Sequence, residues 1–315
     1  MNATAHAGAG CLSWRGSRAP RHACALLAVT AVLLAGCVPE PPPLAPPPAP
    51  LGQVVARVNA NNERIDAVYA ARCALGGVLT DENGRARRVD LQGPLRYAKP
   101  RRLYLDLQAL GGLAGAARIG SNPERYWLAI DGGERHKFVW GKYEHLDEPD
   151  VREFPLRPDL LIEALGVDSL PGARAGLLEP VRRSSSDYDE LIYLRFTEDG
   201  RLVIDREYYI DRRPPFLIRR IVLRDAAGAE AMVARLNDYK PIRGDGPLTA
   251  KTIELSWPEQ QARLQLKLWA RKLIEWDSAR REKVFAFPTR LMGSHERVTQ
   301  IDAHHDEPTT APAHP

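Results

Sequence analysis

The sequence predicts a mainly β protein of the α+β class, built on one large antiparallel sheet with one apolar face. Three observations predict this fold class. About a dozen short segments alternate apolar and polar residues, the connections between them are short, and one long segment before them has helical periodicity. Connections this short leave no room for crossover helices, so neighbouring strands are expected to run antiparallel.

The first 36 residues have the layout of a secretion signal. Arg15, Arg18 and Arg21 precede an uncharged apolar run over 23–34, and no acidic residue accompanies them. The run is too short to span a bilayer as a stable helix. We therefore expect residues 1–36 to be removed during export.

A cysteine follows the apolar run after two small residues. The sequence Leu34-Ala35-Gly36-Cys37 resembles the lipobox of bacterial lipoproteins, in which the thiol is diacylated and the chain is cut just before it. The resemblance implies that Cys37 is the first mature residue and anchors the protein to a membrane. An ordinary signal peptide with an incidental cysteine is the alternative.

Charge and cysteine content narrow the class of protein. The formal charge is +4, and loss of the three leader arginines leaves +1, so no basic stripe suited to nucleic acid remains. Cys11 and Cys24 leave with the signal and Cys37 would be acylated, so no intrachain disulfide is expected. The remaining Cys73 lies among apolar residues and is interpreted as a buried hydrophobe.

Residues 37–51 form a proline-rich stalk. The sequence VPEPPPLAPPPAP over 38–50 favours the extended polyproline conformation. At ~3.1 Å per residue it would hold a domain roughly 40 Å from the membrane surface. Val38 follows the cysteine in place of an aspartate, and in enteric lipoproteins this pattern implies sorting to the periplasmic face of the outer membrane.

One helix and then a series of strands are expected. Residues 53–69 place Val54, Val58, Ile65 and Val68 on one helical stripe, and the period changes to two after Arg72. The alternating positions are Leu103, Leu105 and Leu107; Tyr126, Leu128 and Ile130; His136, Phe138 and Trp140; Ile192, Leu194 and Phe196; Leu202, Ile204, Tyr208 and Ile210; residues 216–223; Ile253, Leu255 and Trp257; and Leu264, Leu266 and Leu268.

An insertion interrupts this series between about 141 and 188. Residues 158–165 predict a short helix that begins with a proline and ends before Gly166. More than forty residues are too many for a plain connection. The insertion is therefore interpreted as a lid over one opening of the sheet.

The C-terminal part completes the predicted domain over 52–301. Residues 298–301 are expected to close an edge of the sheet. Residues 302–315 are polar, contain proline and include His304, His305 and Asp306, so this tail is expected to be disordered.

Two local motifs resemble those of a known superfamily. The sequence KPRRLYL over 99–105 resembles the proline-led strand of the LolA/LolB superfamily, and residues 120–128 resemble its turn before an aromatic strand. The superfamily contains a periplasmic carrier and an outer-membrane receptor that move lipoproteins. The resemblance spans most of 53–301. It implies a strongly curved antiparallel half-barrel of about 11–12 strands, with an N-terminal helix and the helical lid insertion on its concave side.

The resemblance implies binding of lipid acyl chains or lipoproteins between the apolar face and the lid. Burial of each CH₂ contributes about 0.8 kcal/mol, and neither a catalytic group nor a cofactor is required. Packed core is the alternative role for each lining candidate, and only a cavity would separate the two. The lipid-binding candidates are Leu103, Leu105, Leu107, Leu128, Phe138, Ile192, Leu194, Phe196, Leu202, Ile204, Leu264 and Leu266.

Arg206 is a candidate latch for the lid. It is in register with Ile204 and Tyr208, so an unbroken strand would point its guanidinium at the apolar side, where the charge needs a partner. The resemblance implies that Arg206 bonds backbone carbonyls of the lid, as an inward arginine does in the carrier. A β-bulge that turns Arg206 outward is the alternative.

Catalytic and metal-binding motifs were not found in the sequence. It contains neither a G-x-S-x-G elbow nor an H-E-x-x-H helix, and His295-Glu296 lacks a second histidine at the required spacing. The glycine-rich stretch 111–115 lacks the lysine of a phosphate loop, and the acidic run 144–150 lacks the spacing of a calcium loop. The sequence therefore predicts neither an enzyme nor a metal site.

Two functions remain open. The first is a lipid- or lipoprotein-binding module tethered to the outer membrane. The second is a sensing or interaction module that docks an envelope protein partner, as a stress regulator of the same fold does. A dry, lidded apolar cavity would favour the first, and a filled core with an exposed aromatic patch would favour the second.

Overall fold

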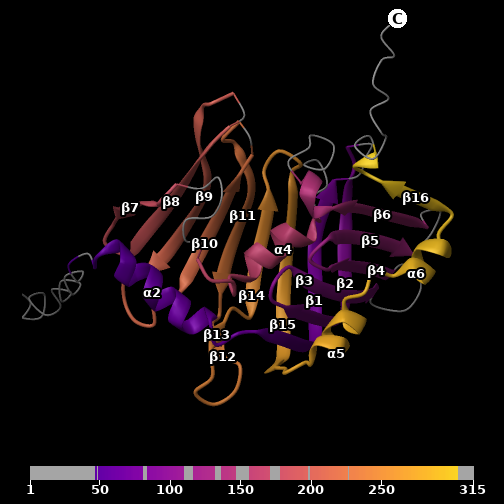
Figure 1. Ribbon diagram of the computed structural model, residues 1–315, viewed down its shortest axis with the longest axis horizontal. Helices are drawn as coiled ribbons and strands as arrows, with labels where there is room; N and C mark the ends of the chain where they lie inside the picture. Colours follow the sequence, from indigo (N-terminus) through magenta and orange to yellow (C-terminus); the bar gives the residue numbers. More distant parts are fainter. Residues whose placement is uncertain are drawn as a thin grey trace, which may run out of the picture. The chain divides into compact units, whose positions relative to one another are not determined.

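Figure 1 shows the computed structural model, which describes residues 47, 49–80, 84–109, 116–131, 136–146, 156–170, 178–197, 199–225 and 227–303. All of these residues belong to the unit that runs from Ala45 to Pro315. The predicted signal peptide, Cys37, most of the stalk, the 111–115 stretch and the tail from His304 onward lie outside the described residues.

Fourteen strands form one open sheet in the described part of the chain, which confirms the mainly β prediction. Their order is β16-β6-β5-β4-β3-β2-β1-β15-β14-β11-β10-β9-β8-β7. Two further short strands, β12 (Lys240–Pro241) and β13 (Leu248–Thr249), pair separately. The strands of the main sheet are β1 (Ala67–Thr80), β2 (Ala86–Ala98), β3 (Arg102–Ala109), β4 (Ala116–Ser121), β5 (Arg125–Asp131), β6 (Lys137–Lys142), β7 (Val181–Ser184), β8 (Tyr188–Phe196), β9 (Leu202–Asp211), β10 (Ile218–Arg224), β11 (Glu230–Asn237), β14 (Thr252–Trp257), β15 (Ala262–Leu273) and β16 (Arg297–Gln300).

The sheet consists of two wings that meet at β1 and β15. The first wing contains β1–β6 and β16, and the second contains β7–β11, β14 and β15. The wings join where β1 and β15 pair antiparallel, from Val68 opposite Leu273 to Val78 opposite Arg263. β16 pairs parallel with β6 and forms the edge of the first wing, which confirms the predicted edge strand.

Helix α2 (Leu51–Asn62) is shorter than the predicted helix over 53–69. Val68 belongs to β1, where it lies opposite both Leu273 and Tyr97. β-branched and aromatic residues favour strands, so pairing on both sides outweighs the helical spacing of these apolar residues. The prediction was therefore wrong for residues 63–69, although Ile65 is fully buried as expected.

Helix α4 (Pro158–Leu165) has the predicted bounds. Gly166 ends it at a φ of 63°, and a Cβ there would lie 2.5 Å from a Leu236 methyl carbon, so glycine suits the position. Helix α4 contacts β4 of the first wing and β11 of the second. In a flat sheet these strands would lie about 29 Å apart, whereas eight helical residues span about 12 Å. The sheet therefore curves around α4 as a half-barrel.

The concave face carries the main apolar core. Val58 from α2 and Leu161 and Leu165 from α4 pack in one cluster with side chains from both wings. In Figure 1, α2 lies beside the second wing and α4 lies between the wings. The strands contribute, among others, Leu75, Leu95, Leu105, Ile119, Ile210, Ile221, Leu236, Ile253 and Trp257.

The outer face of the first wing is covered by the C-terminal segment. This segment forms α5 (Ser278–Val284) and α6 (Thr289–Gly293) before β16, and the sequence did not predict either helix. Phe287, between them, packs edge-on against Trp127, Phe138 and Trp140, with ring centroids 5.4–5.9 Å apart. A second apolar layer therefore exists on this face.

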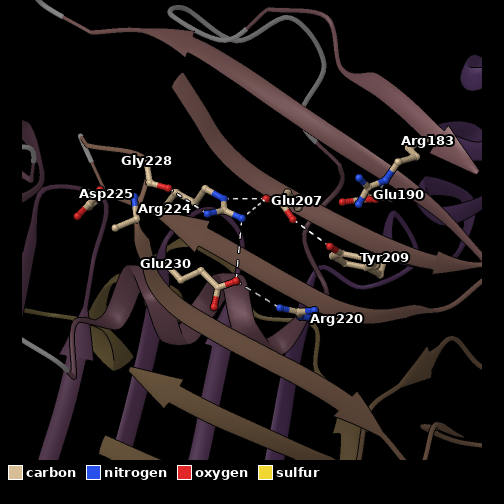
Figure 2. A network of polar contacts seen from close by, with 10 residues as sticks. Arg183, Glu190, Glu207, Tyr209, Arg220, Arg224, Asp225, Gly228 and Glu230 are labelled. Carbon is tan, nitrogen blue, oxygen red and sulfur yellow. Dashed lines mark hydrogen bonds and ion pairs between the residues drawn. The ribbon is translucent and has the colours of Figure 1, made fainter. Parts of the chain in front are cut away.

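The outer face of the second wing carries a network of charges, shown in Figure 2. Arg224 donates from Nε to Glu207 Oε1 at 2.7 Å, and the Tyr209 hydroxyl donates to Oε2 at 3.0 Å. Arg224 also donates to the Gly228 carbonyl at 3.0 Å. Glu207 is 4% exposed, and a carboxylate this buried is stable because both of its oxygens accept hydrogen bonds.

Candidate functional site

The concave face beneath α4 contains half of the predicted lipid-binding residues. Each is at most 4% exposed, and each packs in the same cluster as α2 and α4. In the described structure they are core, and the space between sheet and helix is filled. The six residues are Leu103, Leu105, Leu107, Leu128, Leu264 and Leu266.

Five predicted lining residues lie on the opposite face, which corrects their assignment. Tyr193 is opposite Arg206, but Leu194 is opposite Ile204, so β9 contains Asp205 as an extra residue. This bulge leaves Arg206 on the concave face and turns the residues before it outward. The five outward residues are Ile192, Leu194, Phe196, Leu202 and Ile204.

The alternation on β8 was assigned to the wrong face. Leu191 and Tyr193 are fully buried in the concave core, whereas Phe196 is 58% exposed. Both faces of this strand carry apolar residues, so the alternation did not show which face is buried. The Tyr193 ring packs edge-on against that of Tyr208, with centroids 5.6 Å apart.

Phe138 is also on the outer face. It lies opposite Ala129, while its neighbour Val139 lies opposite Leu128 of the concave core. Phe138 therefore packs with Trp127 and the C-terminal segment. Only the C-terminal segment that covers this face could have indicated that Phe138 points outward, and the sequence did not predict that segment.

A polar contact connects Arg206 to the lid helix. Arg206 Nη1 lies 3.1 Å from Glu163 Oε2 on α4, and the Tyr208 hydroxyl donates to the other oxygen of the same carboxylate. Arg206 Nε donates to Asp205 Oδ2 at 2.6 Å. These contacts of Arg206 reach carboxylates and not the backbone carbonyls that the sequence resemblance implies. We call Glu163, Arg206 and Tyr208 the latch.

Electrostatics keep Arg206 and Tyr208 of the latch protonated. Burial lowers the pKa of Arg206, but Glu163, Tyr208 and Asp205 raise it, and the result lies well above the usual value. Burial, followed by the Glu163 charge, raises the pKa of Tyr208 well above its usual value. Both groups therefore remain donors to Glu163 throughout the physiological pH range.

The C-terminal end of α4 is tied to the first wing and α2. The Tyr97 hydroxyl donates to an Asp168 carboxylate oxygen, and Asn62 Nδ2 donates to the Gly166 and Asp168 carbonyls at 3.1 and 2.7 Å. Asn59 Oδ1 accepts from Leu170 N at 2.8 Å. Polar contacts thus hold α4 on both sides of the concave face.

Three further residues that the sequence analysis considered, His295, Cys73 and Glu144, have structural roles. His295 is buried, with Nε2 3.0 Å from Asp131 Oδ1 and Nδ1 2.7 Å from the Leu291 carbonyl. Burial raises the pKa of the Cys73 thiol to about 12. Glu144 of the acidic run pairs with Lys142 at 3.6 Å, and residues 147–150 of that run lie outside the described ranges.

The described residues contain neither a metal-binding cluster nor a membrane-spanning helix. No cluster of three or more His, Cys, Asp or Glu side chains with metal-binding geometry occurs among them. Of the helices in these ranges, none combines the length and apolar character that crossing a membrane requires.

No protein-family model and no curated protein matches the chain. Solved structures match at 9% identity. They include a DUF1329 family protein from Desulfovibrio piger, with a TM-score of 0.46 over 77% of this chain and 99% of that one. A LolA superfamily protein from Nitrosomonas europaea also has a TM-score of 0.46, over 77% and 100%. A domain described as an outer membrane lipoprotein-sorting protein from Vibrio parahaemolyticus has 0.41, over 74% and 97%.

Proposed function

We propose that the protein is a non-catalytic envelope lipoprotein that binds lipid acyl chains, or lipoproteins that carry them, between α4 and the concave face. The latch is the observation that carries the proposal. It places a carboxylate, a guanidinium and a phenol at the contact between a short helix and an otherwise apolar surface. A helix that polar contacts hold over apolar strands can open as a lid when those contacts break.

Burial of an acyl chain would offset part of the cost of moving α4. The concave face is filled in the described structure, so binding requires α4 to move. Breaking a buried ion pair costs about 3–5 kcal/mol. An acyl chain of about sixteen carbons contributes about 12 kcal/mol when it leaves water, which offsets the loss of this ion pair and part of the other contacts that α4 makes.

The proposed location follows from the N-terminal sequence. Acylated Cys37 would anchor the chain, and residues 37–51 would hold the domain over 52–301 away from the membrane. We place the protein at the periplasmic face of the outer membrane. Replacing Cys37 by alanine should release it from the membrane fraction, and continued tight binding would exclude this anchor.

The test of the proposed function is the uptake rate of a fluorescent fatty acid. We expect the full chain to bind it, and Arg206→Leu to accelerate uptake because the latch no longer holds α4. Arg224→Leu is the matched control, since Arg224 also pairs with a buried carboxylate but lies in the outer network. Absence of binding, or equal rates in all three proteins, would contradict the proposal.

A docking function is the second candidate, and two observations favour it: the concave core is filled, and apolar side chains are exposed on the outer face. Val181, Phe196 and Leu202 are 51–58% exposed at the outer face of the second wing, near its edge strand β7. An exposed apolar strip of this kind suits an envelope protein partner. A photo-crosslinking amino acid at position 196, introduced in cells, should yield a discrete protein adduct if docking occurs. Adducts to lipid alone would exclude it.

A further inference from the structure

A groove of about 390 Å³ lies on the outer face of the sheet, where the wings meet. Its size falls within the range of small-molecule sites. It is separated by the sheet from the concave face, and α5 contributes one wall. Its lining residues are Tyr69, Arg96, Lys272, Ile274, Trp276, Arg280 and Val284.

Tyr69, Arg96 and Lys272 of the groove belong to a cross-strand row in which cations and aromatic rings alternate. Lys272, Tyr69, Arg96 and Tyr104 lie opposite one another on β15, β1, β2 and β3. Lys272 Nζ lies 5.2 Å and Arg96 Cζ 5.6 Å from the centroid of the Tyr69 ring. The shared ring therefore holds two cations at one site.

The cations of the groove have no carboxylate partner within ion-pair distance among the described residues, although Asp277 accepts from the backbone N–H of Arg280 at 2.7 Å. No acidic residue lines it, and Arg96, Lys272 and Arg280 form no ion pair with a carboxylate within the described ranges. On the outer face of the second wing, by contrast, Arg183 and Arg224 both pair with glutamates. Three cations without a carboxylate ion pair in the described ranges, around one concave surface, favour the binding of an anion.

The remaining wall is apolar and firmly held. The Trp276 ring packs edge-on against Phe285 at 5.4 Å, and Phe285 is 1% exposed between Ala67 and Ala98. Arg281 on α5 pairs with Asp66 of the segment before β1. The groove therefore offers an apolar wall beside its cations without rearrangement.

We infer that this groove binds a phosphate group joined to an apolar chain, as in a phospholipid headgroup and the adjoining part of its tails. A phosphate presents several acceptor oxygens and up to two negative charges, which suits three cations that converge from β2, β15 and α5. The apolar chain would lie along Ile274, Trp276 and Val284. This site is additional to the proposed acyl-chain site on the concave face.

Calorimetric titration of the full chain with dihexanoyl phosphatidic acid, below its micelle concentration, tests the inference. We expect binding at least tenfold tighter than that of inorganic phosphate or dihexanoylglycerol, because each lacks one half of the ligand. Lys272→Gln and Arg280→Gln should each weaken binding about tenfold, which corresponds to one lost charge-assisted contact. Both side chains are exposed, so the variants should fold.

Two controls separate this site from other effects. Arg263→Gln removes an exposed cation of the same strand outside the groove and should leave the affinity unchanged. Arg206→Leu alters the concave latch and should also leave it unchanged, so failure of either proposal is distinguishable. Equal affinity of inorganic phosphate would indicate a free-anion site and overturn the inference. Equal affinity of dihexanoylglycerol, or no effect of Lys272→Gln and Arg280→Gln, would overturn it as well.

Discussion

The outer face of the sheet differs between its two wings. On the first wing, Trp127 and Phe138 are fully buried beneath the C-terminal segment. On the second wing, the same face presents the Glu207 network and a strip from which Phe196 and Leu202 protrude. On strands of similar apolar content, the outer side chains are thus buried on the first wing and exposed on the second. The covering segment, and not the alternation within a strand, decides which outer side chains become core.

Removal of the Phe287 ring is expected to give the largest difference in the free energy of unfolding between the two wings. The ring packs against three aromatic side chains of the first wing, so Phe287→Ala should lower the free energy of unfolding by about 3 kcal/mol. Phe196→Ala on the second wing removes a 58% exposed ring and should change it by less than about 0.5 kcal/mol. Urea denaturation measures both, and equal losses would break the comparison.

Adding a methyl group on the covered face of the first wing is expected to lower stability by a smaller amount. A Cβ at Gly120 would lie 2.4 Å from ring atoms of the buried Trp127, so Gly120→Ala should destabilise the protein by about 2 kcal/mol. Gly76→Ala is the matched control, because its Cβ would meet the Val89 carbonyl at an ordinary 3.8 Å. Thermal unfolding should separate the two variants, and a neutral Gly120→Ala would show that the Trp127 layer is loose.

Breaking the outer network of the second wing should cost somewhat less. Glu207→Gln leaves Arg224 without its buried carboxylate partner and should lower the free energy of unfolding by about 1.5 kcal/mol. Glu230 is 38% exposed and lies 3.5–4.0 Å from Arg220 and Arg224, so Glu230→Gln should cost less than about 0.5 kcal/mol. A Glu207→Gln variant as stable as Glu230→Gln would indicate that the network is merely solvated surface.

The smallest expected signal concerns Cys73, at the junction of the wings. Burial raises the pKa of its thiol from 9.0 to about 12, so the folded protein should not react with Ellman's reagent at pH 8 until denaturant is added. A raised pKa stabilises the fold fully below pH 9, and this stabilisation is lost as pH rises from 9 to 12. Rapid labelling of folded residues 45–315, which contain no other cysteine, would show that the junction opens.

The sequence was sufficient for α4 and for only part of the sheet. It located β3, β5, β6, β8, β9, β10, β14, β15 and β16, whereas it did not single out β1, β2, β4, β7 and β11. Alternation was readable because one face of most strands is buried, and Pro158 and Gly166 mark the ends of α4. It was insufficient where both faces are apolar, as on β8, or where one extra residue changes the register, as at Asp205. Neither feature has a distinctive signal in the local sequence, although a β-bulge at Arg206 was one of the alternatives that the sequence left open.

The two sites differ in how far the sequence could predict them. Arg206 stood out as a charge in an apolar strand, although its partner Glu163 lies 43 residues away and had no spacing signal. The outer groove combines β1, β2, β15 and α5, and its cations look like ordinary surface residues in the chain. Only the fold shows that they face one cavity and lack carboxylate partners among the described residues.

Photo-crosslinking with a fatty acid that carries a diazirine in mid-chain tests the central claim most directly. After irradiation of the full chain, mass spectrometry of its peptides identifies the residues that contact the acyl chain. We expect adducts on α4 and on concave strands, near Leu105, Leu161 and Leu264, and more of them in Arg206→Leu. Adducts confined to the outer face, or none on α4, would contradict a lid that opens over the concave face.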